Sequence, residues 1–242
     1  MIVVIRRRLL LGAGLFGCFL ACLAAVLWVG HTAPVPAFAA LEGSRASFVI
    51  DPGHGGEDGG AVSPGGVKES DINLAVALRV SELLRFAGQP TVMTRSADVS
   101  LDTEADTIRA RKASDIRRRV ELVNGTPGAV LLSIHQNSLP SSAVTHGAQV
   151  FWNAGEGAEA LAGVVQDSLN GLINLGNEKN SRKIPDTIYL MNHVTAPAIL
   201  VECGFLSNRE ETALLQTPSY QTKLAAAITA GTLRRLAGEE AP

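Results

Sequence analysis

The sequence of 242 residues has few cysteines, few aromatic residues and no excess of basic residues. Its three cysteines cannot build a disulfide scaffold, and two of them, Cys18 and Cys22, lie in an apolar N-terminal segment. Lysine and arginine number 21 against 23 aspartates and glutamates, which argues against nucleic-acid binding by bulk positive charge. Apolar residues make up 46% of the chain, which excludes intrinsic disorder. The fold must therefore be stabilised by a hydrophobic core.

The N-terminal segment has the features of a membrane anchor or an export signal. Arg6–Arg8 precede an uncharged run of 22 residues from Leu9 to Gly30. Since about 20 such residues cross the hydrocarbon core of a bilayer, the run favours a retained transmembrane helix with the arginines in the cytoplasm. The sequence Ala37-Phe38-Ala39 fits a signal-peptidase site, so a cleaved signal is the alternative. A buried core helix fits less well, because the run has no polar face.

This segment divides the chain into three parts: residues 1–30, a spacer at 31–46 that contains Pro34 and Pro36, and one folded domain at 47–238. Without the three arginines, 18 basic and 23 acidic residues leave the exported part with a net charge of −5. Long-range charge would not attract such a domain to anionic lipid or nucleic acid. We expect the domain to work outside the cytoplasm, in contact with the membrane only through the first segment.

Apolar strands alternate with amphipathic helices along the folded domain. We predict strands at 47–50, 91–94, 130–134, 148–152 and 198–201. We predict helices at 70–87, with Ser70 as the N-cap, at 109–124, at 158–173 and around 220–228. Because the strands at 130–134 and 198–201 are almost entirely apolar, we expect a sheet covered on both faces. The pattern predicts a single α/β domain.

Polar side chains follow three of these strands. The strand at 47–50 leads into Asp51-Pro52-Gly53-His54, the strand at 130–134 into His135, and the strand at 198–201 into Glu202. Glu69 lies at the start of the helix after the first strand. Because the carboxyl ends of strands collect functional groups in α/β sheets, we expect these side chains to lie close together.

Two imidazoles and one carboxylate are typical of a catalytic zinc site that leaves one position open for water. His54, Glu69 and His135 are the candidate ligands, and Glu202 would be the general base. A single histidine or glutamate at a strand end is more often an ordinary polar residue. Glu202, however, follows four apolar residues, and a buried carboxylate without a partner is costly. The four residues together indicate a metal hydrolase.

Four ordered blocks of the sequence carry a family resemblance: Val49–Gly56 (VIDPGHGG), Glu69, Ser133–Asn137 (SIHQN) and Pro197–Asn208 (PAILVECGFLSN). They resemble zinc N-acetylmuramoyl-L-alanine amidases of the amidase-3 family, over roughly residues 47–236. The resemblance implies a twisted, mostly parallel sheet flanked by helices. It also implies one zinc ion on His54, Glu69 and His135, Glu202 as the catalytic carboxylate, and peptidoglycan as the substrate. The bond cleaved would join the lactyl group of N-acetylmuramic acid to L-alanine.

Within this family the chain is most similar to short, N-terminally anchored amidases of spore formation. Residues 190–192 and 204–208 carry this similarity. It implies that peptides are removed from muramic acid so that the spore cortex acquires muramic-δ-lactam, which germination requires. One alternative is a general amidase of wall turnover or cell separation. Another is a membrane-tethered, non-catalytic peptidoglycan-binding protein with a structural zinc closed by Glu202, and the need for an accessory protein stays open.

Further residues are weaker candidates. We expect Asp51 to accept a hydrogen bond near the site and to hold a ligand in place, and Asn137 and Arg182 to contact substrate. Cys203 is predicted to be a small buried residue rather than a nucleophile, because no nearby feature would lower its pKa. Aromatic residues are scarce, and the candidates for stacking against a sugar are Trp152, Tyr189 and Tyr220.

Overall fold

The structure is a computed structural model that describes residues 47–101 and 106–241. The predicted membrane segment at 1–30 and the spacer at 31–46 lie outside these ranges, so both stay predictions. Within the described ranges, every helix is too short or too polar to cross a bilayer.

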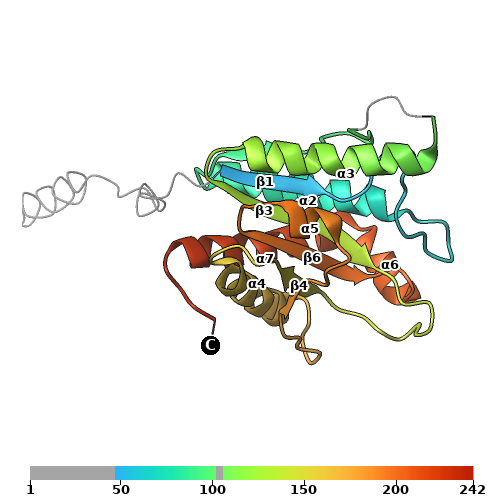
Figure 1. Ribbon diagram of the computed structural model, residues 1–242. Helices are drawn as coiled ribbons and strands as arrows, with labels where there is room; N and C mark the ends of the chain where they lie inside the picture. The colour runs from blue at the N-terminus through green and yellow to red at the C-terminus, as the bar shows by residue number, and fades with distance from the viewer. Residues whose placement is uncertain (1–46, 102–105, 242) are drawn as a thin grey trace, which may run out of the picture. The chain divides into compact units, whose positions relative to one another are not determined.

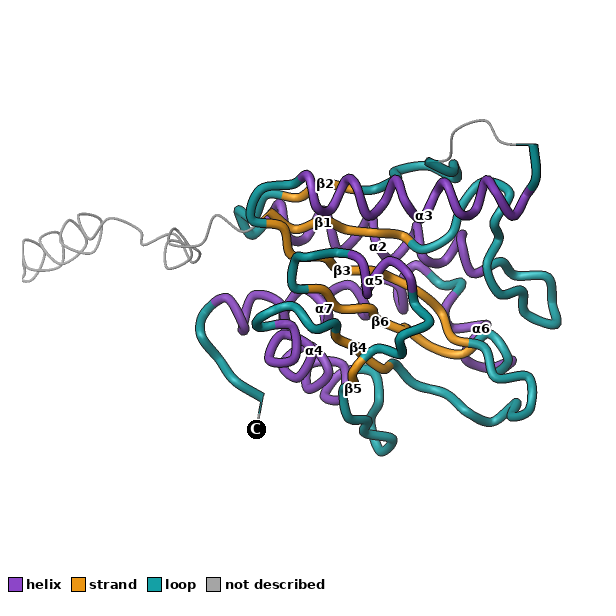
Figure 2. Tube along the Cα trace, in the orientation of Figure 1, coloured by secondary structure: helices purple, strands orange, loops and turns teal. Residues whose placement is uncertain are grey.

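A six-stranded sheet forms the centre of the domain (Figures 1 and 2), with strand order β2-β1-β3-β6-β4-β5. The strands are β1 (Ser47–Pro52), β2 (Thr91–Met93), β3 (Ala129–Asn137), β4 (Gln149–Trp152), β5 (Arg182–Lys183) and β6 (Ala198–Phe205). Strands β2, β1, β3 and β6 are parallel neighbours, whereas β4 runs antiparallel to β6 and parallel to β5. The mostly parallel α/β sheet that the sequence predicted is confirmed.

Helices cover both faces of this sheet (Figure 1). They are α2 (Glu69–Phe86), α3 (Ile108–Gly125), α4 (Ala158–Leu172), α5 (Tyr189–His193), α6 (Arg209–Leu215) and α7 (Pro218–Leu236). Residues of α2, α4 and α7 join the larger hydrophobic core on one face, and residues of α3 and α5 join a smaller core on the other. Burial on both faces explains why the central strands are apolar throughout.

Side chains of the central strands alternate between the two cores, as the pleat of a strand requires. In β1, Ile50 belongs to the larger core, while its neighbour Val49 belongs to the smaller one. The same alternation turns Asp51 toward α3. In β3 and β6 it places His135 and Glu202 on the α3 and α5 face of the sheet, where both line one cavity.

Helix α2 begins at Glu69, and its N-cap residue is Lys68. The prediction of Ser70 as the N-cap is therefore wrong. The backbone N–H groups of Glu69 and Ser70 donate to the carbonyls of Ala61 and Gly59 in the preceding loop. Because the loop satisfies these first donors of the helix, no capping side chain is needed.

Strands β3 and β6 continue beyond the predicted ends at 134 and 201, as far as Asn137 and Phe205. His135 and Glu202 therefore lie inside strands, as directly paired neighbours, rather than after them. Polar side chains are accommodated there because they face the cavity. The short elements β5, α5 and α6 were not predicted, since each has too few residues to show a hydrophobic period.

Candidate metal and catalytic site

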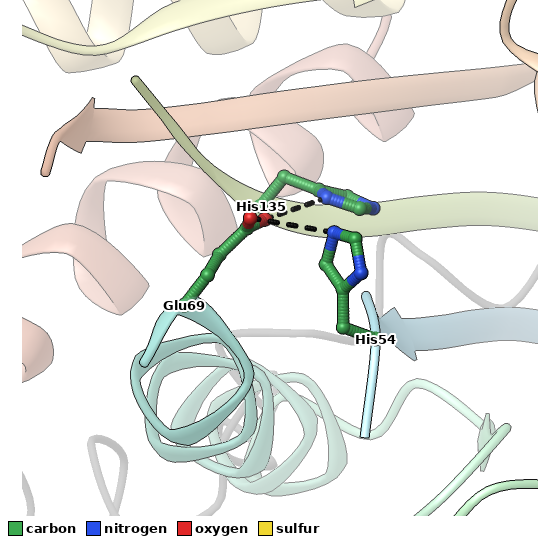
Figure 3. A group of neighbouring side chains, drawn as sticks. All are labelled: His54, Glu69 and His135. Carbon is green, nitrogen blue, oxygen red and sulfur yellow. Dashed lines mark hydrogen bonds and ion pairs between the residues drawn. The ribbon is translucent and has the colours of Figure 1, made fainter. Parts of the chain in front are cut away.

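His54, Glu69 and His135 come together from three different elements (Figure 3). They lie on the loop after β1, at the first residue of α2 and in β3. One potential ligand atom from each lies within 4.8 Å of the others. Nε2 of His54 is 3.3 Å from Oε2 of Glu69, and Nδ1 of His135 is 2.9 Å from Oε1 of Glu69. The structure thus groups the three predicted ligands at a spacing that fits a metal ion.

Glu202 faces the same cavity, which has a volume of about 410 Å³. It is the register partner of His135 across the β3–β6 pair. Its Oε2 atom is buried and has no hydrogen-bond partner among the described residues. Burial raises the pKa of Glu202 to about 7, from a usual value near 4.5. A carboxyl group with that pKa can take up and release a proton near neutral pH.

The charges of His54 and Glu69 depend on each other. Burial disfavours the charged imidazole, but hydrogen bonds with Asp58 and Glu69 outweigh it and raise the pKa of His54 to about 9. Burial also disfavours the Glu69 carboxylate, yet His135 and His54 hold its pKa well below the usual range. Without a metal, a protonated His54 therefore supplies positive charge between two carboxylates.

Glu69 is fixed by backbone and side-chain donors in addition to the two histidines. Its Oε1 accepts from the backbone N–H of Gln136 at 3.1 Å and from Nδ2 of Asn73 at 3.1 Å. Its Oε2 accepts from the backbone N–H of Ala61 at 2.9 Å. These bonds restrict the carboxylate to one orientation, which a ligand with a defined geometry requires.

Gly53 and His54, the two residues that follow β1, each hold a backbone position that few residue types can adopt. His54 has φ 61°, the one non-glycine residue in the left-handed region among the described residues. This conformation costs an ordinary side chain roughly 1–2 kcal/mol, so surrounding contacts must hold it. At Gly53, an added Cβ would lie 2.2 Å from Cε1 and Nε2 of His135. The His135 ring therefore packs directly on the Gly53 backbone.

Arg119 of α3 holds this part of the loop from the buried side. Its Nη1 donates to Oδ1 of Asp51 at 2.6 Å and to the carbonyl of Pro52 at 2.8 Å. Its Nη2 donates to the carbonyl of His54 at 2.8 Å. The guanidinium is almost fully buried, and charge-assisted bonds of this kind are among the stronger ones in proteins. Arg119 thus fixes the backbone of a candidate metal ligand.

Arg95 and Asn73 complete the support of the loop. Arg95 donates from Nε to the carbonyl of Pro52 at 2.9 Å and from Nη2 to that of Gly53 at 3.0 Å. Asn73 donates from Nδ2 to the same Gly53 carbonyl at 3.1 Å. Sequence analysis missed Arg95, Asn73 and Arg119, because nothing in one sequence separates a buried arginine from an exposed one.

Asp51 is buried and accepts hydrogen bonds from the hydroxyls of Thr94 at 2.7 Å and Ser133 at 2.8 Å, besides Arg119. Burial opposes its charged form, but Arg119 and the two hydroxyls outweigh it and lower the pKa of Asp51. The sequence predicted that Asp51 accepts a hydrogen bond near the site and holds a ligand in place. Asp51 does accept hydrogen bonds beside the cavity, and Arg119 links it to His54 by donating to both Asp51 and the His54 carbonyl.

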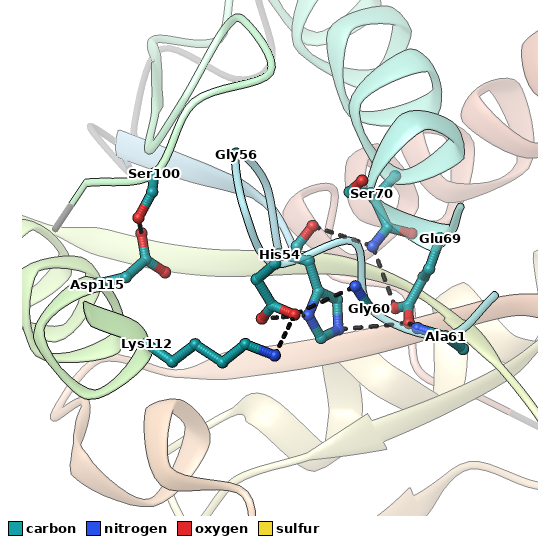
Figure 4. Close-up of polar contacts among 12 residues, drawn as sticks. His54, Gly56, Gly60, Ala61, Glu69, Ser70, Ser100, Lys112 and Asp115 are labelled. Carbon is teal, nitrogen blue, oxygen red and sulfur yellow. Dashed lines mark hydrogen bonds and ion pairs between the residues drawn. The ribbon is translucent and has the colours of Figure 1, made fainter. Parts of the chain in front are cut away.

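Asp58 lies between His54 and Lys112. Figure 4 labels these two partners, whose side chains point toward each other. Its Oδ2 is 2.8 Å from Nδ1 of His54, and its Oδ1 is 2.7 Å from Nζ of Lys112. The hydrogen bond with His54 is the main cause that keeps the pKa of Asp58 well below its usual range. This contact leaves Nε2 of His54 for a metal, the arrangement seen when a carboxylate orients a metal-bound histidine. Asp58 lies in the loop between β1 and α2, and the sequence alone assigned it no role.

Apart from Asp51 and Tyr189, the weaker candidates lie outside the cavity. Asn137 ends β3, where its Oδ1 accepts from the N–H of Ser138 at 2.7 Å, and Arg182 is exposed on β5. Neither lines the cavity around the histidines, and Trp152 and Tyr220 pack against the larger core instead. Cys203 is fully buried, and burial raises the pKa of its thiol, which fits the predicted inert residue.

Comparison with known proteins defines the class to which this fold and cavity belong. Residues 48–234 match the family model of amidase-3, described as N-acetylmuramoyl-L-alanine amidase. The chain therefore belongs to the amidase-3 family of N-acetylmuramoyl-L-alanine amidases, which is zinc-dependent. The enzyme class predicted from the four sequence blocks is confirmed.

Individual relatives narrow the comparison. The chain is 41% identical over 186 residues to the germination-specific N-acetylmuramoyl-L-alanine amidase of Bacillus subtilis, covering 76% of this chain and 77% of that one. It is also similar to the CwlD amidase from Clostridioides difficile, which was solved in complex with the GerS lipoprotein. The two structures match with a TM-score of 0.77 and 32% sequence identity, and the match covers 80% of this chain and 100% of that one. The catalytic domain of CwlV from Bacillus (Paenibacillus) polymyxa matches with a TM-score of 0.68 and 29% identity, over 79% of this chain and 98% of that one.

Proposed function

We propose that the chain hydrolyses the amide between the lactyl group of N-acetylmuramic acid and L-alanine, using one zinc ion held by His54, Glu69 and His135. The observation that carries this proposal is the grouping of these three residues in one cavity with the buried carboxyl of Glu202. Imidazole nitrogen and carboxylate oxygen are both common zinc ligands, and three protein ligands are typical of catalytic sites.

The position of Glu202 supports catalysis over a closed structural site. A structural zinc is held by four protein ligands. Among the described residues, the group of ligand atoms within 4.8 Å of one another contains His54, Glu69 and His135 and does not contain Glu202. Glu202 nevertheless faces the same cavity with a buried, unpartnered Oε2. A carboxyl group placed beside the ligands fits a general base better than a fourth ligand.

When bound, zinc would polarise the amide carbonyl and make water a stronger nucleophile. Glu202 would accept a proton from the attacking water at its free carboxyl oxygen and deliver it to the amide nitrogen as the C–N bond breaks. The products are a free carboxyl on the lactyl group and a free amino group on L-alanine. Asp58 would keep Nδ1 of His54 engaged, while Glu69 stays fixed by its backbone donors.

Peptide release tests this proposal directly. Purified protein loaded with zinc should release stem peptides from muropeptides, detected by mass spectrometry as separate glycan and peptide masses. Removal of the metal with a chelator should abolish release, and added zinc should restore it. Unchanged muropeptides under zinc-loaded conditions would contradict the proposed reaction.

We further propose that the activity serves the spore cortex, where a freed lactyl carboxyl can close to muramic-δ-lactam. The support is the similarity to the germination-specific amidase of Bacillus subtilis and to CwlD. A cell-wall substrate places the domain outside the cytoplasm, and residues 1–30 would tether it to the membrane. Because the CwlD amidase was solved with a lipoprotein, an accessory protein of that kind is the partner to look for. A general wall amidase is the alternative.

A further inference from the structure

We propose that Tyr189, backed by His193, forms a saccharide-binding platform in the wall of the catalytic cavity. This inference rests on the proposed function, since it identifies the surface that binds the sugar part of the substrate. The platform lies on α5 (Figure 1), which the sequence pattern did not reveal as an element.

The two rings form one stacked unit. The centroids of Tyr189 and His193 are 3.7 Å apart, and the ring planes differ by 14°. Nδ1 of His193 also lies 2.8 Å from the backbone carbonyl of Tyr189, one turn earlier in the helix. Tyr189 lines the cavity that contains Glu202, yet it is 43% exposed. His193 covers one face of the tyrosine ring, so a ligand would stack on the opposite face.

The platform is held by the residues around it. Leu190 and Met191, which follow Tyr189 in α5, are buried in the smaller core. Asn124 at the end of α3 donates from Nδ2 to the carbonyl of His193 at 3.1 Å and accepts from the N–H of Thr195 at 2.9 Å. A ring fixed before binding loses little conformational entropy when a ligand arrives, which favours affinity.

The positions of Trp152 and Tyr220 exclude them as stacking partners for a sugar in this cavity. Among the residues that line the cavity, Tyr189 is the one phenylalanine, tyrosine or tryptophan. Trp152 and Tyr220 pack against the larger core on the far face of the sheet. Of the three predicted stacking residues, the structure brings only Tyr189 to the cavity that contains Glu202.

The substrate explains why a sugar should reach this wall. The scissile carbonyl belongs to a lactyl group that is joined to the muramic acid ring by a short ether link. A carbonyl that lies near Glu202 therefore places the pyranose ring against the neighbouring wall. A pyranose presents a face of C–H groups, and burying that face on an aromatic ring removes apolar surface from water. Tyr189 offers such a ring in the wall of the cavity that contains Glu202.

Two substrates that differ only in the sugar test the proposal: an N-acetylmuramoyl peptide and the same peptide carrying D-lactate alone. Tyr189→Ala should raise KM for the muramoyl peptide by about fivefold and leave kcat nearly unchanged, since stacking contributes to binding. The KM for the lactoyl peptide should not change. Tyr189→Phe keeps the ring and should behave like the wild type. Phe86→Ala, which removes an exposed aromatic ring outside the cavity, is the matched control and should leave both KM values unchanged.

An equal loss on both substrates, or no loss on either, would overturn the platform. A binding measurement separates this outcome from failure of the reaction itself. Zinc-loaded Glu202→Gln protein, titrated with a peptide-free disaccharide of peptidoglycan and followed by NMR, should show saturable binding that the added Tyr189→Ala change removes. Binding that survives Tyr189→Ala contradicts the platform. If the wild type cleaves neither peptide, the proposed reaction is wrong and this titration alone decides the platform.

Discussion

At the scale of single residues, Glu69 and Glu202 show how the surroundings of two glutamates in one cavity give them different pKa values. Glu69 accepts bonds from backbone N–H groups and two imidazoles, which hold its pKa well below the usual range despite burial. Glu202 has a buried Oε2 without a partner among the described residues, and burial raises its pKa to about 7. Carboxyls whose environments push their pKa values apart are suited to different tasks. Glu69 suits a ligand and Glu202 a base.

Replacing Glu202 with Gln should keep the fold and the zinc but reduce peptide release at least ~10²-fold, because an amide cannot accept the proton from water. Release is measured on purified muropeptides, and zinc content by elemental analysis. A wild-type rate of peptide release in the variant would show that Glu202 takes no part in the reaction. Loss of zinc from the variant would show that Glu202 is a zinc ligand.

The same variant should change stability in a pH-dependent way. The folded pKa of Glu202, about 7, exceeds its unfolded value near 4.5. The unfolded chain therefore releases this proton first, and stability falls as pH rises between these two values. Metal-free Glu202→Gln protein should therefore melt at a higher temperature than metal-free wild type at pH 8, and at a similar temperature at pH 4. Identical melting curves at pH 8 would show that the carboxyl is not destabilised by burial.

His54→Ala should lower zinc content well below one ion per chain, as elemental analysis would show. In the wild type, zinc must displace the proton that His54 carries below its pKa of about 9. Zinc affinity should therefore keep rising with pH up to about 9, measured by competition with a chromophoric chelator. His146→Ala, an exposed change outside the cavity, should match the wild type. An affinity that levels off near pH 7 would show that His54 is neutral in the metal-free protein.

At the scale of secondary-structure elements, the sequence predicted the strands and helices that are long enough to show a hydrophobic pattern. The strands at β1, β3 and β6 and the helices α2, α3, α4 and α7 each have enough apolar residues to show a period. Ile116, Val120 and Val123 of α3, spaced as on one face of a helix, pack in or against the smaller core. Short elements and the ends of β3 and β6 could not be predicted, because tertiary pairing rather than local pattern decides them.

The candidate ligands were predictable because their spacing forms a family motif, whereas the residues that support them were not. Arg119 lies in a helix with several exposed basic residues, and Arg95 follows a short edge strand. Only the folded structure shows both of them buried, with their donors on the carbonyls of Pro52, Gly53 and His54. Two elements distant in sequence therefore fix the loop that ends β1.

Gly53→Ala tests how closely that loop must approach β3. The new Cβ would overlap the His135 ring, so the ring must move and zinc affinity should fall at least about tenfold, as when residues that support metal ligands are changed. Gly65→Ala is the matched control, since its Cβ would meet open space except for Ser63 Oγ at 3.8 Å. Zinc titration of both variants is the measurement. Equal affinity in both would show that His135 does not need the Gly53 backbone as its contact surface.

At the scale of the whole molecule, the family match at 48–234 takes up most of the described chain. The cavity lies between residues of α3 and the segment 187–190, at the carboxyl ends of β1 and β3. The catalytic residues and the proposed sugar-binding platform would thus lie in the same cavity, which would face the peptidoglycan. Localisation near a particular peptidoglycan would then depend on residues 1–30 or on a partner protein rather than on this surface.

Deletion of the gene in a spore-forming host tests the proposed cortex role. Vegetative walls should stay nearly normal, while cortex muropeptides should lose muramic-δ-lactam, because the lactam cannot close while a peptide occupies the lactyl carboxyl. Spores should form but fail to complete germination, and mass spectrometry of cortex muropeptides is the measurement. Wild-type protein should restore the lactam, and Glu202→Gln protein, produced at the same level, should not. Normal lactam content in the deletion strain would contradict the cortex role. The protein would then be a general wall amidase with the same cavity chemistry, and its substrate would lie in another layer of the wall.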